Sequence, residues 1–294
     1  MTLEHALRLS TSLGLMALML STGLSVDWNE LKRVMTRWRV MPGMVGVNFL
    51  GVPLLTLGLI WVVSPDPAIA MGFLTLALAP GAPVGPAITG VARGDGPSAV
   101  GSMVGLGLLS VVLTPLLLRW LAPFVLPESP NVIPVQGIAL SLLLIQIVPL
   151  LTGVVVRHNF LAAAERMARP LRMFGVLLLL VVVAALAGPA CRTLEMVRLR
   201  GWVAISVLIA GCLAMGWWSG GRTREERIAG AVTASVRNVA AALVVSNAVA
   251  AETLAPPTVL AYGLLSTLAV LIGAVLCARV VYSATPLDPR QGLR

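Results

Sequence analysis

The stretch Ala79-Pro80-Gly81-Ala82-Pro83-Val84-Gly85-Pro86 decides the fold, because it places three prolines and two glycines inside an apolar segment. Residues 74–78 before it and residues 87–92 after it continue that segment. In lipid every polar backbone group needs an internal partner, so such a cluster is tolerated only where protein or a water-filled cavity satisfies the freed groups. We expect two half-helices with an unwound centre, and the alternative is one continuous helix kinked by proline.

The composition places this segment in a membrane. The chain has 294 residues, of which 58% are hydrophobic and 11% charged, and its mean hydropathy is +0.94. A soluble protein would be about a quarter charged. With aromatic residues at 5% and no alternating ten-residue segments, the sequence favours helices over a transmembrane barrel.

We predict an all-α integral membrane protein with about nine transmembrane helices. Each needs about 20 apolar residues to cross the hydrocarbon core. The nine segments are residues 6–24, 40–63, 68–92, 97–121, 132–156, 172–189, 199–219, 227–250 and 256–282. The first of them carries charged residues before its apolar run and no small-residue cleavage site, so we expect it to remain as a span. Residues 25–39 mix apolar and basic side chains and are interpreted either as a short interfacial helix or as a plain loop.

The basic residues set the predicted orientation. Of 21 Lys and Arg residues, fifteen fall in loops on one side of the nine spans and five on the other, and Arg237 lies within a span. Basic loops are cytoplasmic, which predicts a cytoplasmic C-terminus, an outside N-terminus and a plasma (inner) membrane location. The net charge of +9 is thereby explained by topology, and no nucleic-acid partner is expected.

The eighth span carries a second anomaly. Thr233-Ala234-Ser235-Val236-Arg237-Asn238 places the only formal charge of any predicted span near its middle, and no predicted span holds an acidic residue to neutralise it. An arginine at membrane depth is costly unless it faces a wet cavity or an anion. We interpret Arg237 as an anion-binding residue, and the alternative is that it caps carbonyl groups freed by the third span. The two roles are compatible.

The two anomalies lie five spans apart, as equivalent elements of two inverted repeats would. We expect a single transmembrane domain over residues 1–294, with repeat one at about 6–121 and repeat two at about 132–282. Interrupted segments at corresponding positions of inverted repeats are typical of secondary transporters, whose site lies where the broken helices cross.

Several stretches resemble the bile acid:sodium symporter family, within the broader bile/arsenite/riboflavin transporter grouping. The quoted stretches are Leu13 to Leu24 (LGLMALMLSTGL), Gly46 to Leu50 (GVNFL) leading to Pro53-Leu54-Leu55, Ala79-Pro80-Gly81 ending in Val91-Ala92-Arg93-Gly94-Asp95, Leu113 to Leu117 (LTPLL), and Arg237-Asn238. The resemblance implies a panel domain and a core domain, with two broken helices crossing in the core. Movement between the domains would expose a substrate cavity alternately to each side.

The chain departs from the sodium-coupled members of that family. Gly85-Pro86 stands where they have a Ser-Asn pair, Thr233 where they have a glutamate, Arg237 where they have a glutamine, and Asn48 where they have another glutamine. Sodium needs several oxygen ligands, and a guanidinium close to the ion would repel it. The departures therefore argue against two-sodium coupling.

Arg237 instead suits bidentate recognition of a carboxylate or sulfonate. We therefore predict a secondary active transporter of a small organic anion that works by alternating access in the lipid bilayer and requires no protein partner. The predicted substrate-binding residues are Arg237, Asn238, Asn48, Thr233, Ser235, Pro83 and Gly85. No cofactor is expected, sodium or proton coupling stays open, and Thr233, Asn238 and Asn48 are the weak sodium candidates.

Other function classes fit less well. The alternatives kept open are a sodium-coupled symporter of the usual family type and a passive solute channel, although a channel would show polar residues along several spans. The predicted spans contain no His, Asp or Glu, so they lack the side chains that would serve as acid, base or metal ligand in an enzyme. Three widely spaced cysteines predict neither a disulfide framework nor a metal site, and the first broken helix lacks the cysteine of arsenite-efflux relatives.

Overall fold

The computed structural model describes residues 3–26, 40–126, 133–196 and 199–284, and every regular element in these ranges is helical. Eight helices are named α1, α3, α4, α5, α6, α7, α8 and α9, and they span Leu3–Ser25, Met41–Gly46, Val52–Val63, Pro67–Ala77, Gly85–Val91, Gly96–Leu121, Val135–Leu142 and Val148–Asn159. Helices α10 to α14 span Leu161–Glu195, Leu199–Ser219, Arg224–Ser235, Val239–Ala250 and Ala255–Ala284. Three short segments link helices: the π-helical η1 (Val47–Gly51) and η3 (Leu143–Ile147), and the 3₁₀ segment η2 (Ala122–Phe124).

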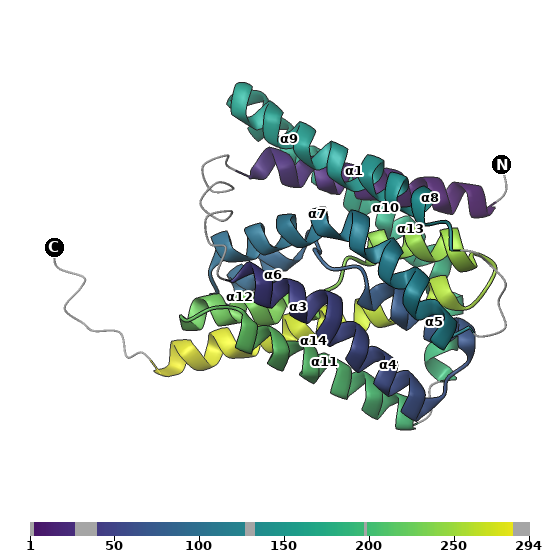
Figure 1. The fold of residues 1–294 in the computed structure, drawn as a ribbon. Helices are drawn as coiled ribbons and strands as arrows, with labels where there is room; N and C mark the ends of the chain where they lie inside the picture. The colour runs from purple at the N-terminus through teal and green to yellow at the C-terminus, as the bar shows by residue number, and fades with distance from the viewer. Residues whose placement is uncertain (1–2, 27–39, 127–132, 197–198, 285–294) are drawn as a thin grey trace.

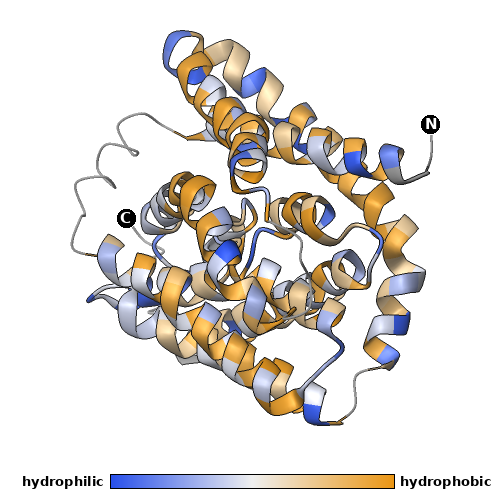
Figure 2. Cartoon of the chain, turned by 45° about the vertical axis from the view of Figure 1, so that its right-hand side comes forward, coloured by the Kyte–Doolittle hydropathy of each residue, from blue (hydrophilic) through white to orange (hydrophobic). Residues whose placement is uncertain are grey.

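The described residues contain eight helices long and apolar enough to cross a membrane. The third predicted span is absent from that set because it is divided into α5 and α6, which are each too short. The count of about nine therefore stays a prediction. Hydrophobic residues dominate nearly all of these helices (Figure 2). The segment predicted at 172–189 is the middle of a longer helix, α10. The proposed interfacial helix falls almost entirely on residues 27–39, outside the described residues.

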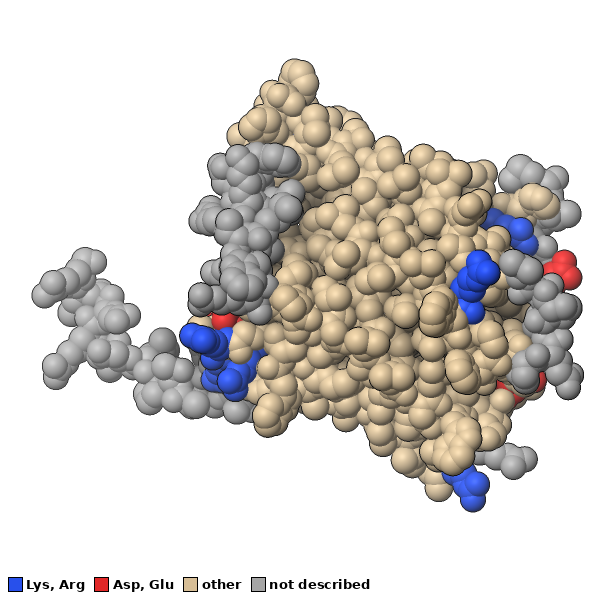
Figure 3. All heavy atoms as spheres, in the orientation of Figure 1, with Lys and Arg blue, Asp and Glu red and all other residues tan. Residues whose placement is uncertain are grey.

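On the face drawn in Figure 3, the described Lys, Arg, Asp and Glu residues lie at the two ends, and a broad surface without them separates the ends. Helix α1 begins and α14 finishes at opposite ends of the bundle (Figure 1). The chain is therefore an integral, multi-pass membrane protein whose helices run between two charged ends.

The helices form two groups, which we call the panel and the core. In the panel, α1 packs along both α9 and α10 (Figure 1). Glycines allow this close approach, because a Cβ on Gly153 would clash with the carbonyl oxygen of Leu20, and one on Gly175 would lie 2.9 Å from the carbonyl oxygen of Gly14. The core comprises α3 to α7 and α11 to α14, and its main contacts with the remaining helices are those of α14 with α10, of α7 with α8 and of α13 with α1.

Local sequence signals set the helix starts in the core. The Asp66 side chain caps α5 by accepting from the Ala68 N–H at 2.8 Å, and Asp95 caps α7 by accepting from Ser98 at 2.9 Å. Thr223 and Glu226 form a capping box that begins α12. These caps fix where the two broken helices enter the core, and so they fix the depth of their breaks.

The broken helices run in opposite directions. Helix α5 contacts α13, and α6 contacts α12, so the first half of each broken helix packs against the second half of the other. This is the crossing that the resemblance implied. The first break covers residues 78–84 and the second covers residues 236–238.

Candidate functional site

The two breaks are hydrogen-bonded to each other through Asn238. Its backbone N–H donates to the carbonyl oxygen of Ala79 at 2.9 Å, and its Nδ2 donates to that of Gly81 at 3.4 Å. Its Oδ1 accepts from the Ala241 N–H at 3.1 Å and thereby caps α13. A single amide residue therefore satisfies backbone groups of both broken helices.

Gly81 allows the first break to pack closely against α7. Its φ of +85° lies in the left-handed region, where a side chain is strained. A Cβ at this position would also lie 2.9 Å from the carbonyl oxygen of Met103 and 3.0 Å from the backbone nitrogen of Gly107. Thr114 of α7 donates to the carbonyl oxygen of Leu78, which stabilises the other end of the break.

Arg237 lies in the second break, next to Asn238, and its side chain is almost fully buried, with 3% of its surface exposed. Its Nη1 donates to Oδ1 of Asn48 at 3.0 Å. Its Nη2 is buried and has no hydrogen-bond partner. Among the described residues no aspartate or glutamate pairs with it. A buried charge without a counterion costs several kcal/mol, about the penalty that a bound anion would offset.

Asn48 and Gln146 reach the crossing from two π-helical segments. Asn48 lies in η1 and Gln146 in η3, and each segment is followed by a proline, Pro53 or Pro149. Such π segments are rare and occur often at functional sites. Gln146 Oε1 accepts from Asn238 Nδ2 at 3.3 Å, so both π segments deliver an amide to the second break.

Two further side chains lie close to the guanidinium. The thiol of Cys212 on α11 lies beside Arg237, and Tyr262 on α14 is near enough to interact with it electrostatically. Both are buried. Asn48 and the neutral forms of Cys212 and Tyr262 carry no formal charge, so they leave the positive charge of Arg237 uncompensated.

The other predicted site residues lie near the crossing, but no described hydrogen bond joins them to Arg237. Thr233 and Ser235 are buried in the last turn of α12, and Ser235 Oγ donates to the carbonyl oxygen of Ala231 at 2.8 Å. Pro83 is half-buried, at the end of the first break. A Cβ added at Gly85 would meet no atom within 4 Å, so the start of α6 borders open space.

The weak sodium candidates offer few uncommitted oxygens. Asn48 Oδ1 accepts from Arg237 and Asn238 Oδ1 accepts from Ala241, while Thr233 Oγ1 has no described hydrogen bond. Among the described residues no group of three or more His, Cys, Asp or Glu side chains could hold a metal ion. The guanidinium is thus the one formal cationic group at the crossing that the described residues provide.

One of the two roles considered for Arg237 belongs to its neighbour. Asn238, not Arg237, bonds the carbonyl groups freed by the first break, because an amide at the start of α13 reaches them directly.

Cys212 and Tyr262 were missed, since each lies in an otherwise apolar span and no local pattern marks it. Gln146 is not among the predicted site residues, although its proximity to Pro149 could have marked it as part of the site.

A sequence model described as the sodium bile acid symporter family matches residues 12–195. The match covers more than half of the chain, including the first break, and it finishes before α11, so Arg237 lies beyond it.

Two curated proteins are similar to this chain. A probable sodium/metabolite cotransporter, BASS2, chloroplastic, of Oryza sativa subsp. japonica is 25% identical over 211 residues, which are 70% of this chain and 48% of that protein. An uncharacterized sodium-dependent transporter, YocS, of Bacillus subtilis (strain 168) is 25% identical over 169 residues, which are 57% of this chain and 51% of that protein. The alignments therefore span about half the length of these relatives.

Proposed function

The chain belongs to the sodium bile acid symporter family, and on that premise we propose that it is a secondary transporter of a small organic anion, with Arg237 as the residue that binds the anion. The family is one of symporters and not of enzymes. A carboxylate or sulfonate is the substrate class that a guanidinium recognises best, because two parallel N–H groups match two oxygens.

The observation that carries this proposal is the unpartnered Nη2 of Arg237. One nitrogen of the guanidinium is held by Asn48, which fixes the plane of the group, and the other is buried with no acceptor. An anion that accepted from Nη2 would satisfy the donor and neutralise the charge in one contact. Cys212 and Tyr262 interact electrostatically with the guanidinium, and both are neutral hydrogen-bond donors.

Alternating access follows from the two groups of helices. The panel and the core meet through a limited set of helices, and the crossing lies inside the core. Rigid-body movement of one group against the other would expose the crossing first to one side and then to the other. We propose that the protein lies in the plasma (inner) membrane.

Sodium coupling is the alternative that the names of the two relatives favour. Against it, the guanidinium of Arg237 donates a hydrogen bond to Asn48, one of the weak sodium candidates, and so holds its positive charge beside that oxygen. A sodium ion within about 6 Å of a guanidinium is repelled unless an anion lies between them. We therefore propose that substrate binding does not require sodium, and coupling to protons stays open.

The test is thermal stabilisation of the purified protein by a panel of carboxylates and sulfonates, each as its sodium and its choline salt. A ligand at about 100 times its dissociation constant adds about 2.7 kcal/mol to the stability of the native state. We expect at least one organic anion to raise the melting temperature of the wild type equally with both cations. Arg237→Gln should abolish the shift, because its neutral amide cannot bind the anion bidentately.

Two variants serve as controls. Arg237→Lys keeps the charge but loses the planar fork, so it should bind the same anion more weakly. Arg119→Gln removes an exposed arginine at the end of α7 and should leave the shift unchanged. Stabilisation by sodium alone, or an anion-induced shift that persists in Arg237→Gln, would contradict the proposal and restore the sodium-coupled alternative.

A further inference from the structure

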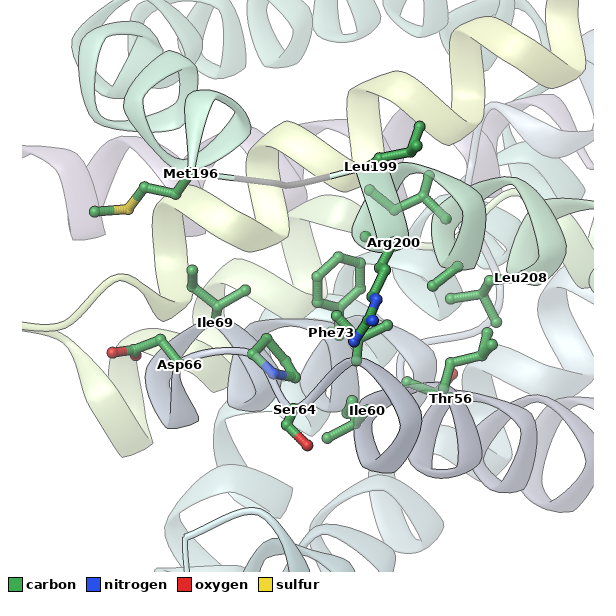
Figure 4. A pocket seen from close by; sticks show the side chains of 16 residues that line it. Thr56, Ile60, Ser64, Asp66, Ile69, Phe73, Met196, Leu199, Arg200 and Leu208 are labelled. Atoms are coloured by element: carbon green, nitrogen blue, oxygen red, sulfur yellow. The ribbon is translucent and has the colours of Figure 1, made fainter.

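A cavity lies away from the crossing, between α4, α5 and the first half of α11 (Figure 4). Its volume is about 830 Å³. It includes the turn between α4 and α5 and the start of α11, so it lies at the end of the bundle where α1 begins. We call it the outer cavity. Cavities of this size hold small organic ligands.

The walls of the outer cavity are apolar and its charged groups lie at one end. Ile60, Ile69 and Leu208 contribute to the walls, together with the ring of Phe73. Arg200 and Asp66 are the only charged residues among the described residues that line it. In Figure 4 the Arg200 side chain extends among Phe73, Ile60 and Ser64, while the Asp66 carboxylate points away from them.

The two charges are not equivalent. Asp66 Oδ1 accepts from the Ala68 N–H at 2.8 Å, so this carboxylate is engaged as the cap of α5. Arg200 is exposed, and within the described ranges no carboxylate forms an ion pair with it. Asp66 keeps its negative charge, but its carboxylate points away from the apolar walls, so the charge beside those walls is the positive charge of Arg200 (Figure 4).

We propose that the outer cavity binds an amphipathic monoanion, with its carboxylate or sulfonate on Arg200 and its apolar body against the walls. Each buried methylene would tighten binding about fourfold, so a medium-chain anion should bind far better than a short one. This site is distinct from the crossing. The Phe73 ring lies 4.9 Å from that of Tyr262, and Leu208 precedes Cys212 by one turn, so both residues separate the cavity from the surroundings of Arg237.

Cysteine accessibility tests the proposal. Ala204→Cys places a thiol on the cavity lining, in a background with Cys191→Ser and Cys277→Ser. The protein is reconstituted in lipid, treated with an anionic or a cationic methanethiosulfonate reagent, and followed by intact mass. The same background without Ala204→Cys measures any reaction of the buried Cys212.

We expect octanoate to slow the modification, and butanoate at the same concentration to leave its rate unchanged. The anionic reagent should also react about thirtyfold faster than the cationic one, because attraction of the first and repulsion of the second each contribute about fivefold, the factor for one charge a few ångströms away in water. Arg200→Gln should remove both effects, and Arg200→Lys should retain the preference for the anionic reagent. Arg192→Gln, an exposed arginine near the same end of the bundle, is the matched control and should change neither.

The result separates this site from the crossing. Protection by octanoate should persist in Arg237→Gln even if the transport proposal fails. Equal protection by octanoate and butanoate, or protection that persists in Arg200→Gln, would overturn the inference. Loss of protection in Arg237→Gln with retention in Arg200→Gln would also overturn it, because the anion would then bind at the crossing.

Discussion

Asn238 and Arg237 are adjacent residues whose side chains are bonded very differently. Asn238 forms hydrogen bonds to both broken helices and to Gln146, and so it links the two breaks. Arg237 keeps a buried nitrogen without an acceptor, and we propose that this nitrogen donates to the anion. The distinction arises because amide oxygens and nitrogens find partners within a break, whereas a guanidinium brings five donors and no acceptor.

At this scale we predict that Asn238→Ala lowers the melting temperature more than Asn238→Ser. Alanine loses both the cap of α13, about 1 kcal/mol, and the bonds to Gly81 and Gln146, about 0.6 kcal/mol each in a membrane protein. Serine retains the cap but is too short to replace those bonds. Thermal unfolding of the purified variants at one scan rate measures both losses. A serine variant as stable as the wild type would show that the bonds across the crossing contribute nothing.

Helix pairs in this molecule pack according to the size of the residues between them. Glycines bring α1 against α9 and α10, and another pair, Gly216 and Gly230, brings α11 against α12, where a Cβ on either would clash with the backbone of the partner helix. In lipid, where the hydrophobic effect does not hold helices together, close backbone contact supplies much of the packing energy. The panel therefore depends on glycines at the contact between α1 and α9.

Gly153→Ala should destabilise the panel, because its Cβ would clash with the Leu20 carbonyl oxygen and lie 2.7 Å from the Leu24 nitrogen. Overpacking of this kind typically costs about 1–3 kcal/mol. The matched control is Gly58→Ala, also inside a helix, where a Cβ meets no atom within 4 Å. The control should be neutral or slightly stabilising, since alanine favours the helix over glycine. Equal melting temperatures for the two variants would contradict the contact between α1 and α9.

The whole molecule is a bundle with two charged ends and an interior site. The panel is not continuous in sequence. Helix α1 packs against α9 and α10, although the core helices α4 to α7 lie between them in the chain. The outer cavity opens towards the end of the bundle where α1 begins, and the distribution of basic loops predicts that this end faces outside. An anion from outside would then meet Arg200 before Arg237.

The orientation is tested with single cysteines in the background of Cys191→Ser and Cys277→Ser. Glu252→Cys lies in the turn between α13 and α14, and Arg222→Cys lies before α12, at the other end of the bundle; both positions are exposed. In intact cells a membrane-impermeant maleimide should label Glu252→Cys and should label Arg222→Cys only after permeabilisation. The reverse pattern would invert the predicted topology.

The sequence by itself determined the class of the protein and the positions of its two broken helices. Hydropathy is a sum over neighbouring residues, and Pro80 or Gly81 interrupts a helix through its effect on the local backbone. Both properties can therefore be recognised from the sequence alone. It also determined that Arg237 stands at membrane depth without an acidic neighbour in any predicted span.

Only the tertiary structure decided which groups interact with the charge of Arg237. Asn48, Cys212 and Tyr262 come from three different helices. The hydrogen bond of Arg237 to Asn48 and its electrostatic interactions with Cys212 and Tyr262 depend on how those helices pack and on the extra turn width of η1. The same packing assigned the carbonyl groups of the first break to Asn238 and left the Arg237 nitrogen free. Hydrogen bonds between distant segments are set by a few ångströms of helix placement, and no spacing along the chain records that distance.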